Sequence, residues 1–136
     1  MFSVLLIEGD VSVAQMLGEV FAFKGWRADM HTDKRGAVEA LVGTDHYDVI
    51  VTSYEVPGTT GVELAGLSTR LANRRATPVI LITGSDHRDI EADATAAGVT
   101  EILHKPFSIH RLLELAQTLA VPPLSQSLGS SAKAAT

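Results

Sequence analysis

The segment "VIVTSYEVPG", residues 49–58, changes from an apolar strand pattern to a polar turn. Its first three residues are β-branched, which is typical of a strand buried on both faces of a sheet. Pro57-Gly58 is a turn pair that closes the segment. Ser53 therefore lies at the predicted carboxyl end of a strand, the edge where open α/β sheets place their functional sites.

The rest of the chain alternates apolar runs with amphipathic segments. Strands are predicted at residues 3–7, 26–31, 47–52, 78–83 and 100–103. Helices are predicted at residues 11–24, 36–43, 60–72, 87–97 and 109–121. This order of five βα units predicts an α/β fold, in which helices cover both faces of a parallel sheet through right-handed crossovers.

Residues at the predicted helix ends support these boundaries. The expected N-terminal caps are Asp10, Asp86, Ser108 and the capping box of Thr60 with Glu63. The expected C-terminal stops are Gly25, Gly43, Gly98 and the Pro122-Pro123 pair.

Length and composition limit the classes of protein that are possible. The 136 residues suit one domain at 1–121, followed by a Pro-, Ser-, Gly- and Ala-rich flexible tail at 122–136. No apolar run is long enough for a membrane span, and the N-terminus lacks the basic region of a signal peptide, so we expect a cytoplasmic protein. The absence of cysteine excludes disulfides, thiol catalysis and thiolate metal sites.

The charge balance argues against direct nucleic-acid binding. The net charge is −5 and the isoelectric point is near 5.4, whereas phosphate-backbone binding requires clustered cations. Arg70, Arg74 and Arg75 form the one basic cluster. We expect them at a helix C-terminus, where cations interact favourably with the helix dipole.

Four motifs each include the end of a predicted strand and the residues that follow it. They are "VLLIEGD" (4–10), "YDVIVTSYEVPGTTGVEL" (47–64), "PVILITG" (78–84) and "ILHKPF" (102–107). Because these motifs occur in this order and at this spacing, the chain resembles the receiver domain of bacterial two-component response regulators over about residues 2–120. The resemblance implies a flavodoxin-like three-layer α/β/α fold with strand order 2-1-3-4-5, five helices and a cis peptide bond before Pro106.

The resemblance also implies a chemistry. In that family two adjacent acidic residues and a strand-three aspartate hold Mg²⁺, and the aspartate accepts a phosphoryl group from a histidine kinase. A threonine and a lysine then engage the phosphate, and an aromatic residue swings inward. This chain keeps Thr83, Lys105 and Pro106, and it keeps the turn residues Pro57, Gly58 and Gly61.

The chain departs from the family at the reactive positions. The acidic pair is replaced by Glu8-Gly9, the acceptor by Ser53 and the aromatic switch residue by Ile102. A serine hydroxyl needs a neighbouring base to become nucleophilic, and strand alternation turns His104, the nearest candidate, away from Ser53. We therefore interpret Ser53 as a small polar residue and predict no catalytic residue.

The same departures remove most of the metal ligands. Mg²⁺ prefers octahedral oxygen ligands, and here only Glu8 is well placed, with Glu55 available through its backbone carbonyl. Asp10 is expected to cap the first helix instead. We predict no specific metal site and no cofactor.

The remaining pocket is expected to be a structural polar network. Its predicted members are Glu8, Gly9, Asp10, Ser53, Glu55, Thr83, Lys105 and Pro106. We expect Glu8 to pair with Lys105, because a partly buried ammonium needs a counter-charge. Thr83 is expected to hydrogen-bond Ser53 or water.

A protein without phosphoryl transfer is expected to act by binding. The last helix carries more apolar residues than one face can bury, so Leu115 and Leu112 are candidates for an exposed contact patch. Phe23 on the first helix is a second candidate. Ile102 is apolar and cannot form a side-chain hydrogen bond, so it suits a surface that stays in one conformation.

Three functional hypotheses follow. The favoured one is a phosphorylation-independent pseudo-receiver that binds a histidine kinase, a phosphotransfer protein or a response regulator, with a homodimer as a further possibility. The second is a phosphorelay receiver with an unusual acceptor, namely Ser53, Asp48 or Glu55. The third is a flavodoxin-like nucleotide or cofactor binder, which the absence of a glycine-rich phosphate loop after the first strand disfavours.

Overall fold

The computed structural model describes residues 1–84 and 89–121. Its elements in chain order are β1 Ser3–Ile7, α1 Val11–Phe23, β2 Arg27–His31, α2 Lys34–Val42, β3 Val49–Ser53, β4 Glu55–Val56, β5 Thr59–Thr60, α3 Gly61–Arg70, β6 Val79–Thr83, α4 Glu91–Ala97, β7 Glu101–His104 and α5 Ile109–Ala120. The predicted tail, residues 122–136, lies outside the described residues.

The central sheet has the predicted topology. Its five strands are parallel and pair in the order β2-β1-β3-β6-β7, which is the expected order 2-1-3-4-5 once the short β4–β5 hairpin is set aside. The expected flavodoxin-like fold with five helices is thus confirmed. The antiparallel β4–β5 hairpin follows β3 and was not predicted.

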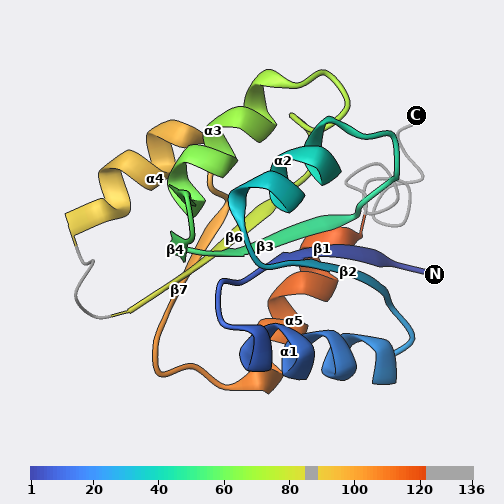
Figure 1. Ribbon diagram of the computed structural model, residues 1–136. Coiled ribbons are helices and arrows are strands. Elements are labelled where there is room, and N and C mark those ends of the chain that lie inside the picture. The colour runs from blue at the N-terminus through green and yellow to red at the C-terminus, as the bar shows by residue number, and fades with distance from the viewer. Residues whose placement is uncertain (85–88, 122–136) are drawn as a thin grey trace, which may run out of the picture.

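The helices form two layers on opposite faces of the sheet (Figure 1). Helices α1 and α5 cover one face, and α2, α3 and α4 cover the other. Alternate residues of each strand point to opposite faces, so Val4 and Leu6 pack under α1 and α5. Leu5 and Ile7 pack under α2 and α3. Burial on both faces explains why the strands read as continuous apolar runs.

Side-chain caps set the starts of four helices. The Asp10, Asp33, Thr60 and Ser108 side chains accept from the backbone N–H three residues on, at 3.1, 2.9, 3.1 and 2.9 Å. The caps at Asp10, Thr60 and Ser108 are confirmed, and Asp33 was missed. Helix α4 starts at Glu91 without a side-chain cap, while the predicted cap, Asp86, lies outside the described residues.

The prediction of exposed leucines on the last helix is wrong. Leu112 is fully buried and Leu115 is only 8% exposed, and both pack in the core beside Ala116. The buried face of α5 is therefore rotated relative to the expected one, leaving Leu113 and Leu119 half-buried at its edge. Neither Leu112 nor Leu115 can form a surface patch.

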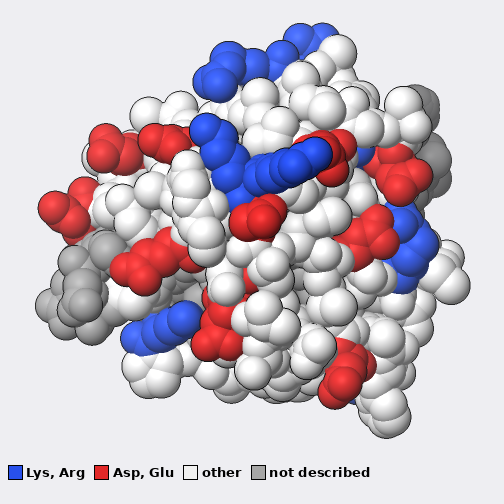
Figure 2. Space-filling model, viewed as in Figure 1, with Lys and Arg blue, Asp and Glu red and all other residues white. Residues whose placement is uncertain are grey.

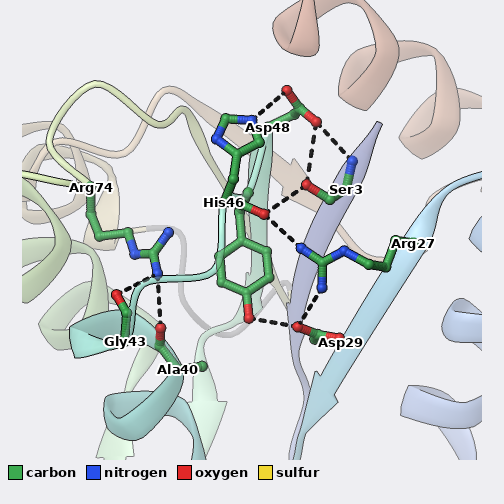
Figure 3. Close-up of polar contacts among 9 residues, drawn as sticks. Ser3, Arg27, Asp29, Ala40, Gly43, His46, Asp48 and Arg74 are labelled. Atoms are coloured by element: carbon green, nitrogen blue, oxygen red, sulfur yellow. Dashed lines mark hydrogen bonds and ion pairs between the residues drawn. The ribbon is translucent and has the colours of Figure 1, made fainter. Parts of the chain in front are cut away.

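The interpretation of the arginine cluster also needs correction. Arg70 lies in the last turn of α3, as expected, but Arg74 lies beyond the helix and is only 2% exposed. Its guanidinium donates to the carbonyls of Leu41, Gly43 and Ala40 at 2.9, 3.0 and 3.1 Å. Arg74 thus donates to carbonyls at the end of α2 (Figure 3), where Ala40 also accepts from the Gly43 N–H and Gly43 also accepts from Asn73.

Among the described residues, none of the helices combines the length and apolar character that crossing a membrane requires.

Candidate functional site

A cleft of about 760 Å³ opens at the carboxyl ends of β1, β3 and β6. It brings together seven of the eight predicted pocket residues. Its lining includes Glu8, Gly9, Asp10, Ser53, Glu55, Pro57, Thr83, Gly84 and Lys105. Pro106 does not line the cleft, but it follows the predicted cis peptide bond, which is confirmed.

The side chains of Glu8 and Ser53, at the ends of neighbouring strands, form a hydrogen bond. Ser53 ends β3 and donates its hydroxyl to Oε1 of Glu8, which follows β1. The other carboxylate oxygen, Oε2, accepts the backbone N–H of Asp10 at 2.9 Å. Glu8 is only 7% exposed, so both of its oxygens are held inside the protein.

The predicted pair of Glu8 with Lys105 does not form. The Glu8 oxygens are occupied by Ser53 and Asp10, and Lys105 is exposed. Lys105 makes no ion pair with any residue of the described ranges. A solvated ammonium needs no counter-charge, which removes the reason for the expected pair.

Thr83 ends β6 and is buried at the floor of the cleft. Its hydroxyl donates to the carbonyl of Gly84 at 3.4 Å and not to Ser53. His104 lies on β7 and points to α4, where Nε2 is 3.2 Å from Oε2 of Glu91. The expectation that His104 turns away from Ser53 is confirmed. The nearest base to Ser53 is instead Glu8, which sequence reasoning overlooked by searching for histidine.

The other acidic residues that line the cleft lie in different elements from Glu8. Asp10 is exposed and caps α1, and Glu55 is exposed on β4. Within residues 1–84 and 89–121, no three histidine, aspartate or glutamate side chains are grouped to hold a metal ion. The expectation of no Mg²⁺ site stays a prediction.

The predicted switch and contact positions differ in exposure. Ile102 on β7 is half-buried and packs against the cluster of Leu81, Ile90 and Ala94, which joins β6 to α4. Phe23, the last residue of α1, is 87% exposed. Of the three candidate contact residues, only Phe23 lies at the surface.

A second polar network lies near the amino ends of β1, β2 and β3, at the end of the sheet opposite the cleft (Figure 3). The Tyr47 hydroxyl donates to Asp29 at 2.7 Å, and Arg27 pairs with the same Asp29 oxygen at 2.9 Å. The Tyr47 ring lies 4.8 Å from the Arg74 guanidinium and 5.4 Å from that of Arg27. Burial, together with the hydrogen bond to Asp29, raises the pKa of Tyr47 to about 12.

The same network fixes the start of β1 to the loop before β3. Asp48 accepts from the Ser3 amide at 2.8 Å and lies 3.0 Å from Nε2 of His46. Burial alone would raise the pKa of Asp48, but these hydrogen bonds lower it below the usual value. Asp48 is thus a structural carboxylate, far from the cleft.

Acidic and basic side chains are interspersed on the face shown in Figure 2. That face carries no broad basic surface of the kind that phosphate backbones bind.

A parallel sheet in this order, with its cleft at the carboxyl ends of the strands, defines the flavodoxin-like class of α/β proteins. The model of the response regulator receiver domain family matches residues 4–117, and the chain belongs to this family. The transcriptional regulatory protein TcrA of Mycobacterium tuberculosis is 28% identical over 118 residues, which are 86% of this chain and 45% of TcrA. The chain thus spans about half the length of such relatives.

Solved structures support the same fold. The receiver domain of the Francisella response regulator 1452 has a TM-score of 0.75 and 30% identity, covering 88% of this chain and 97% of that domain. The receiver domain of the sensor histidine kinase PA1611 of Pseudomonas aeruginosa was solved with a magnesium ion coordinated in its active site cleft. It has a TM-score of 0.79 and covers 89% of this chain and 98% of that one. Because the two sequences are only 21% identical, this similarity shows a shared fold and nothing more.

Proposed function

We propose that this chain is a pseudo-receiver, which acts in two-component or phosphorelay signalling through protein–protein contact and forms no aspartyl phosphate. The observation that carries the proposal is the side chain at the end of β3, where Ser53 presents a hydroxyl. A hydroxyl occupies the position where the resemblance implies the acceptor carboxylate, and the remaining carboxylate is bound to that hydroxyl. A serine cannot form the acyl phosphate that a carboxylate forms.

The arrangement of ligands supports a cleft without a cation. Mg²⁺ needs oxygen ligands in near-octahedral geometry and usually one or two free carboxylates. Residue 9 offers no side chain, and both oxygens of Glu8 accept hydrogen bonds from the protein. We propose that the chain is not an enzyme and uses no cofactor.

The exposed surface of α1 is the better candidate for partner binding, since Leu112 and Leu115 are buried. Phe23, Val11 and Met16 on α1 are 87%, 57% and 41% exposed. Met16 and Phe23 are seven residues apart and so share one face of α1, and an apolar helix face that is exposed is a candidate interaction site. The proposed partner is a histidine kinase, a phosphotransfer protein or a response regulator, in the cytoplasm, with a second copy of the chain as the alternative.

Incubation with acetyl phosphate and Mg²⁺, followed by intact-mass measurement, tests the proposal. We expect no stable addition to the wild-type chain. The Ser53–Glu8 hydrogen bond favours one second candidate, in which Ser53 attacks phosphorus, Glu8 takes the hydroxyl proton and acetate leaves. A stable phosphoryl addition that is lost in Ser53→Ala would establish that candidate and overturn the proposal.

Partner binding is tested with Phe23→Glu against purified histidine kinases and phosphotransfer proteins of the source organism. We expect Phe23→Glu to weaken a specific interaction. Gln117→Glu, which adds the same charge at an exposed position of α5, is the matched control. Equal binding by both variants would remove the α1 surface from the proposal.

A further inference from the structure

Strand β2 lies at one edge of the sheet and pairs only with β1 among the described strands (Figure 1). None of its residues is buried, whereas β1, β3 and β6 are buried throughout. The main chain of Arg27, Asp29 and His31 hydrogen-bonds to β1. Because main-chain groups alternate in direction along a strand, the N–H and C=O groups of Ala28 and Met30 point to the open edge.

The charged side chains of β2 distinguish this edge from an ordinary open one. Charges at a sheet edge usually prevent it from pairing with another chain. Here the two charges have opposite signs and lie two residues apart on one face of the strand, at Arg27 and Asp29 (Figure 3). Their side chains are 40% and 31% exposed, so both are accessible to a partner.

Each of the two side chains also keeps one polar atom without a hydrogen bond. Arg27 donates through its two Nη atoms to Asp29 and to the His46 carbonyl, and Asp29 accepts from Arg27 and Tyr47 through Oδ2 alone. Within the part of the chain that the structure describes, Nε of Arg27 and Oδ1 of Asp29 make no hydrogen bond. One donor and one acceptor thus remain for a partner of complementary charge.

An antiparallel copy of β2 supplies that partner. A pairing centred on Ala28 places Arg27 of each copy opposite Asp29 of the other. The two Ala28 residues then exchange their outward main-chain hydrogen bonds, and the charged residues form the non-hydrogen-bonded pairs, whose side chains approach most closely. A pairing centred on Asp29 would instead oppose two carboxylates, which is destabilising. A pairing centred on Met30 would place Arg27 beyond the strand of the other copy.

The α1 side of β2 has room for a second strand. A hollow of about 410 Å³ lies between α1 and β2. Its lining includes the small residues Gly18, Ala22 and Ala28, together with Gln15, Glu19 and Met30. A strand added beside Ala28 therefore meets little bulk on this face.

We propose that β2 pairs antiparallel with β2 of a second copy of this chain, centred on Ala28, and joins two five-stranded sheets into one. The charge complementarity of Arg27 and Asp29 carries this inference. It does not rest on the proposed function, because self-association and phosphorylation are measured separately. Failure of either one leaves the other intact.

Sedimentation velocity of the full chain, from micromolar to millimolar concentration, should show a dimer that forms as the concentration rises. Arg27→Asp and Asp29→Arg should each weaken self-association at least about tenfold, because each places like charges opposite one another. An equimolar mixture of the two variants should recover the wild-type affinity, since acidic residues then face basic ones at both contacts. Both variants stay net negative, so general charge attraction does not favour the mixed pair.

Arg35→Asp is the matched control, because it makes the same charge change at an exposed position of α2. It should self-associate like the wild type. A wild-type chain that stays monomeric at every concentration would overturn the proposal and leave the edge to a segment of another protein. A mixture that associates no better than either variant alone would also overturn it.

Hydrogen exchange of the wild-type chain decides the question if the charge variants fail to fold. The amides of Ala28 and Met30 should exchange more slowly at millimolar than at micromolar concentration, because only the dimer gives them acceptors. The amides of Asp29 and His31 bond to β1 and are the internal control, protected at both concentrations. Exchange of the Ala28 and Met30 amides that does not depend on concentration would overturn the proposal.

Discussion

Ser53 at the end of β3 donates its hydroxyl to the carboxylate of Glu8 at the end of β1. This hydrogen bond joins two central strands at the point where a receiver domain is expected to hold a cation. It replaces repulsion between carboxylates with attraction between a neutral donor and a charged acceptor. If this bond stabilises the cleft without a bound ion, as the proposed function requires, its removal should lower the stability of the fold.

Replacing Ser53 by alanine should destabilise the fold by about 1–3 kcal/mol, because it removes a hydrogen bond from a buried carboxylate. The free energy of unfolding is measured by urea denaturation at neutral pH. Ser12→Ala, at an exposed position of α1, is the control and should change stability by less than about 0.5 kcal/mol. A Ser53→Ala variant as stable as the wild type would show that the hydrogen bond contributes nothing.

Replacing Arg74 by methionine should cost about 1–3 kcal/mol, because three hydrogen bonds from a buried guanidinium are lost and the Leu41 carbonyl loses its side-chain donor. Methionine keeps much of the buried stem, so the loss reports the guanidinium contacts. Arg75→Met is the matched control, since Arg75 is exposed one residue away. Similar denaturation midpoints for the two variants would contradict the role assigned to Arg74.

These two sites show how far the sequence predicts the molecule. Continuous β-branched runs such as Val49–Val51 predict the strands, since burial on both faces imposes that composition. Caps such as Asp10 and Ser108 act within one helical turn, so their positions follow from local sequence. The contacts of Arg74 join residues more than thirty positions apart, and no local pattern reports them.

The errors on α5 and in the cleft have related physical causes. The apolar residues of α5 are strongly periodic and place Leu112 and Ala116 on one face, so the expected exposed patch came from taking that face as too narrow, and packing against the sheet buries Leu115 as well. The cleft residues were correctly grouped, because parallel strands end at the same edge. Which of them pair depends on side-chain reach, and Ser53 is the partner of Glu8 where Lys105 was expected.

The phenol of Tyr47 should titrate about two pH units above an ordinary tyrosine, because burial and the hydrogen bond to Asp29 favour its neutral form. Its contribution to stability is complete below pH 10, the ordinary pKa, and is lost as the pH rises toward about 12, the folded-state pKa. Tyrosinate absorbance during alkaline titration should show a late component that Tyr47→Phe removes. Asp29→Asn should shift this component to lower pH. A wild-type titration with both tyrosines ionising together near pH 10 would contradict the shift.

Ser68 on α3 has a buried hydroxyl without a hydrogen-bond partner among the described residues. Ser68→Ala removes an unsatisfied polar atom, so stability should be unchanged or should rise by up to about 1 kcal/mol. Urea denaturation measures the effect, with Ser12→Ala as the exposed control. A loss above about 1 kcal/mol would mean that the Ser68 hydroxyl has a stabilising partner.

The most direct test of the pseudo-receiver assignment is the melting temperature with and without millimolar Mg²⁺ and beryllofluoride, a phosphoryl mimic. The PA1611 receiver domain, whose cleft coordinates magnesium, is the positive control. A ligand at a hundred times its dissociation constant stabilises the native state by about 2.7 kcal/mol, so binding is readily detected. We predict no change for this chain. A clear rise in its melting temperature would contradict the account.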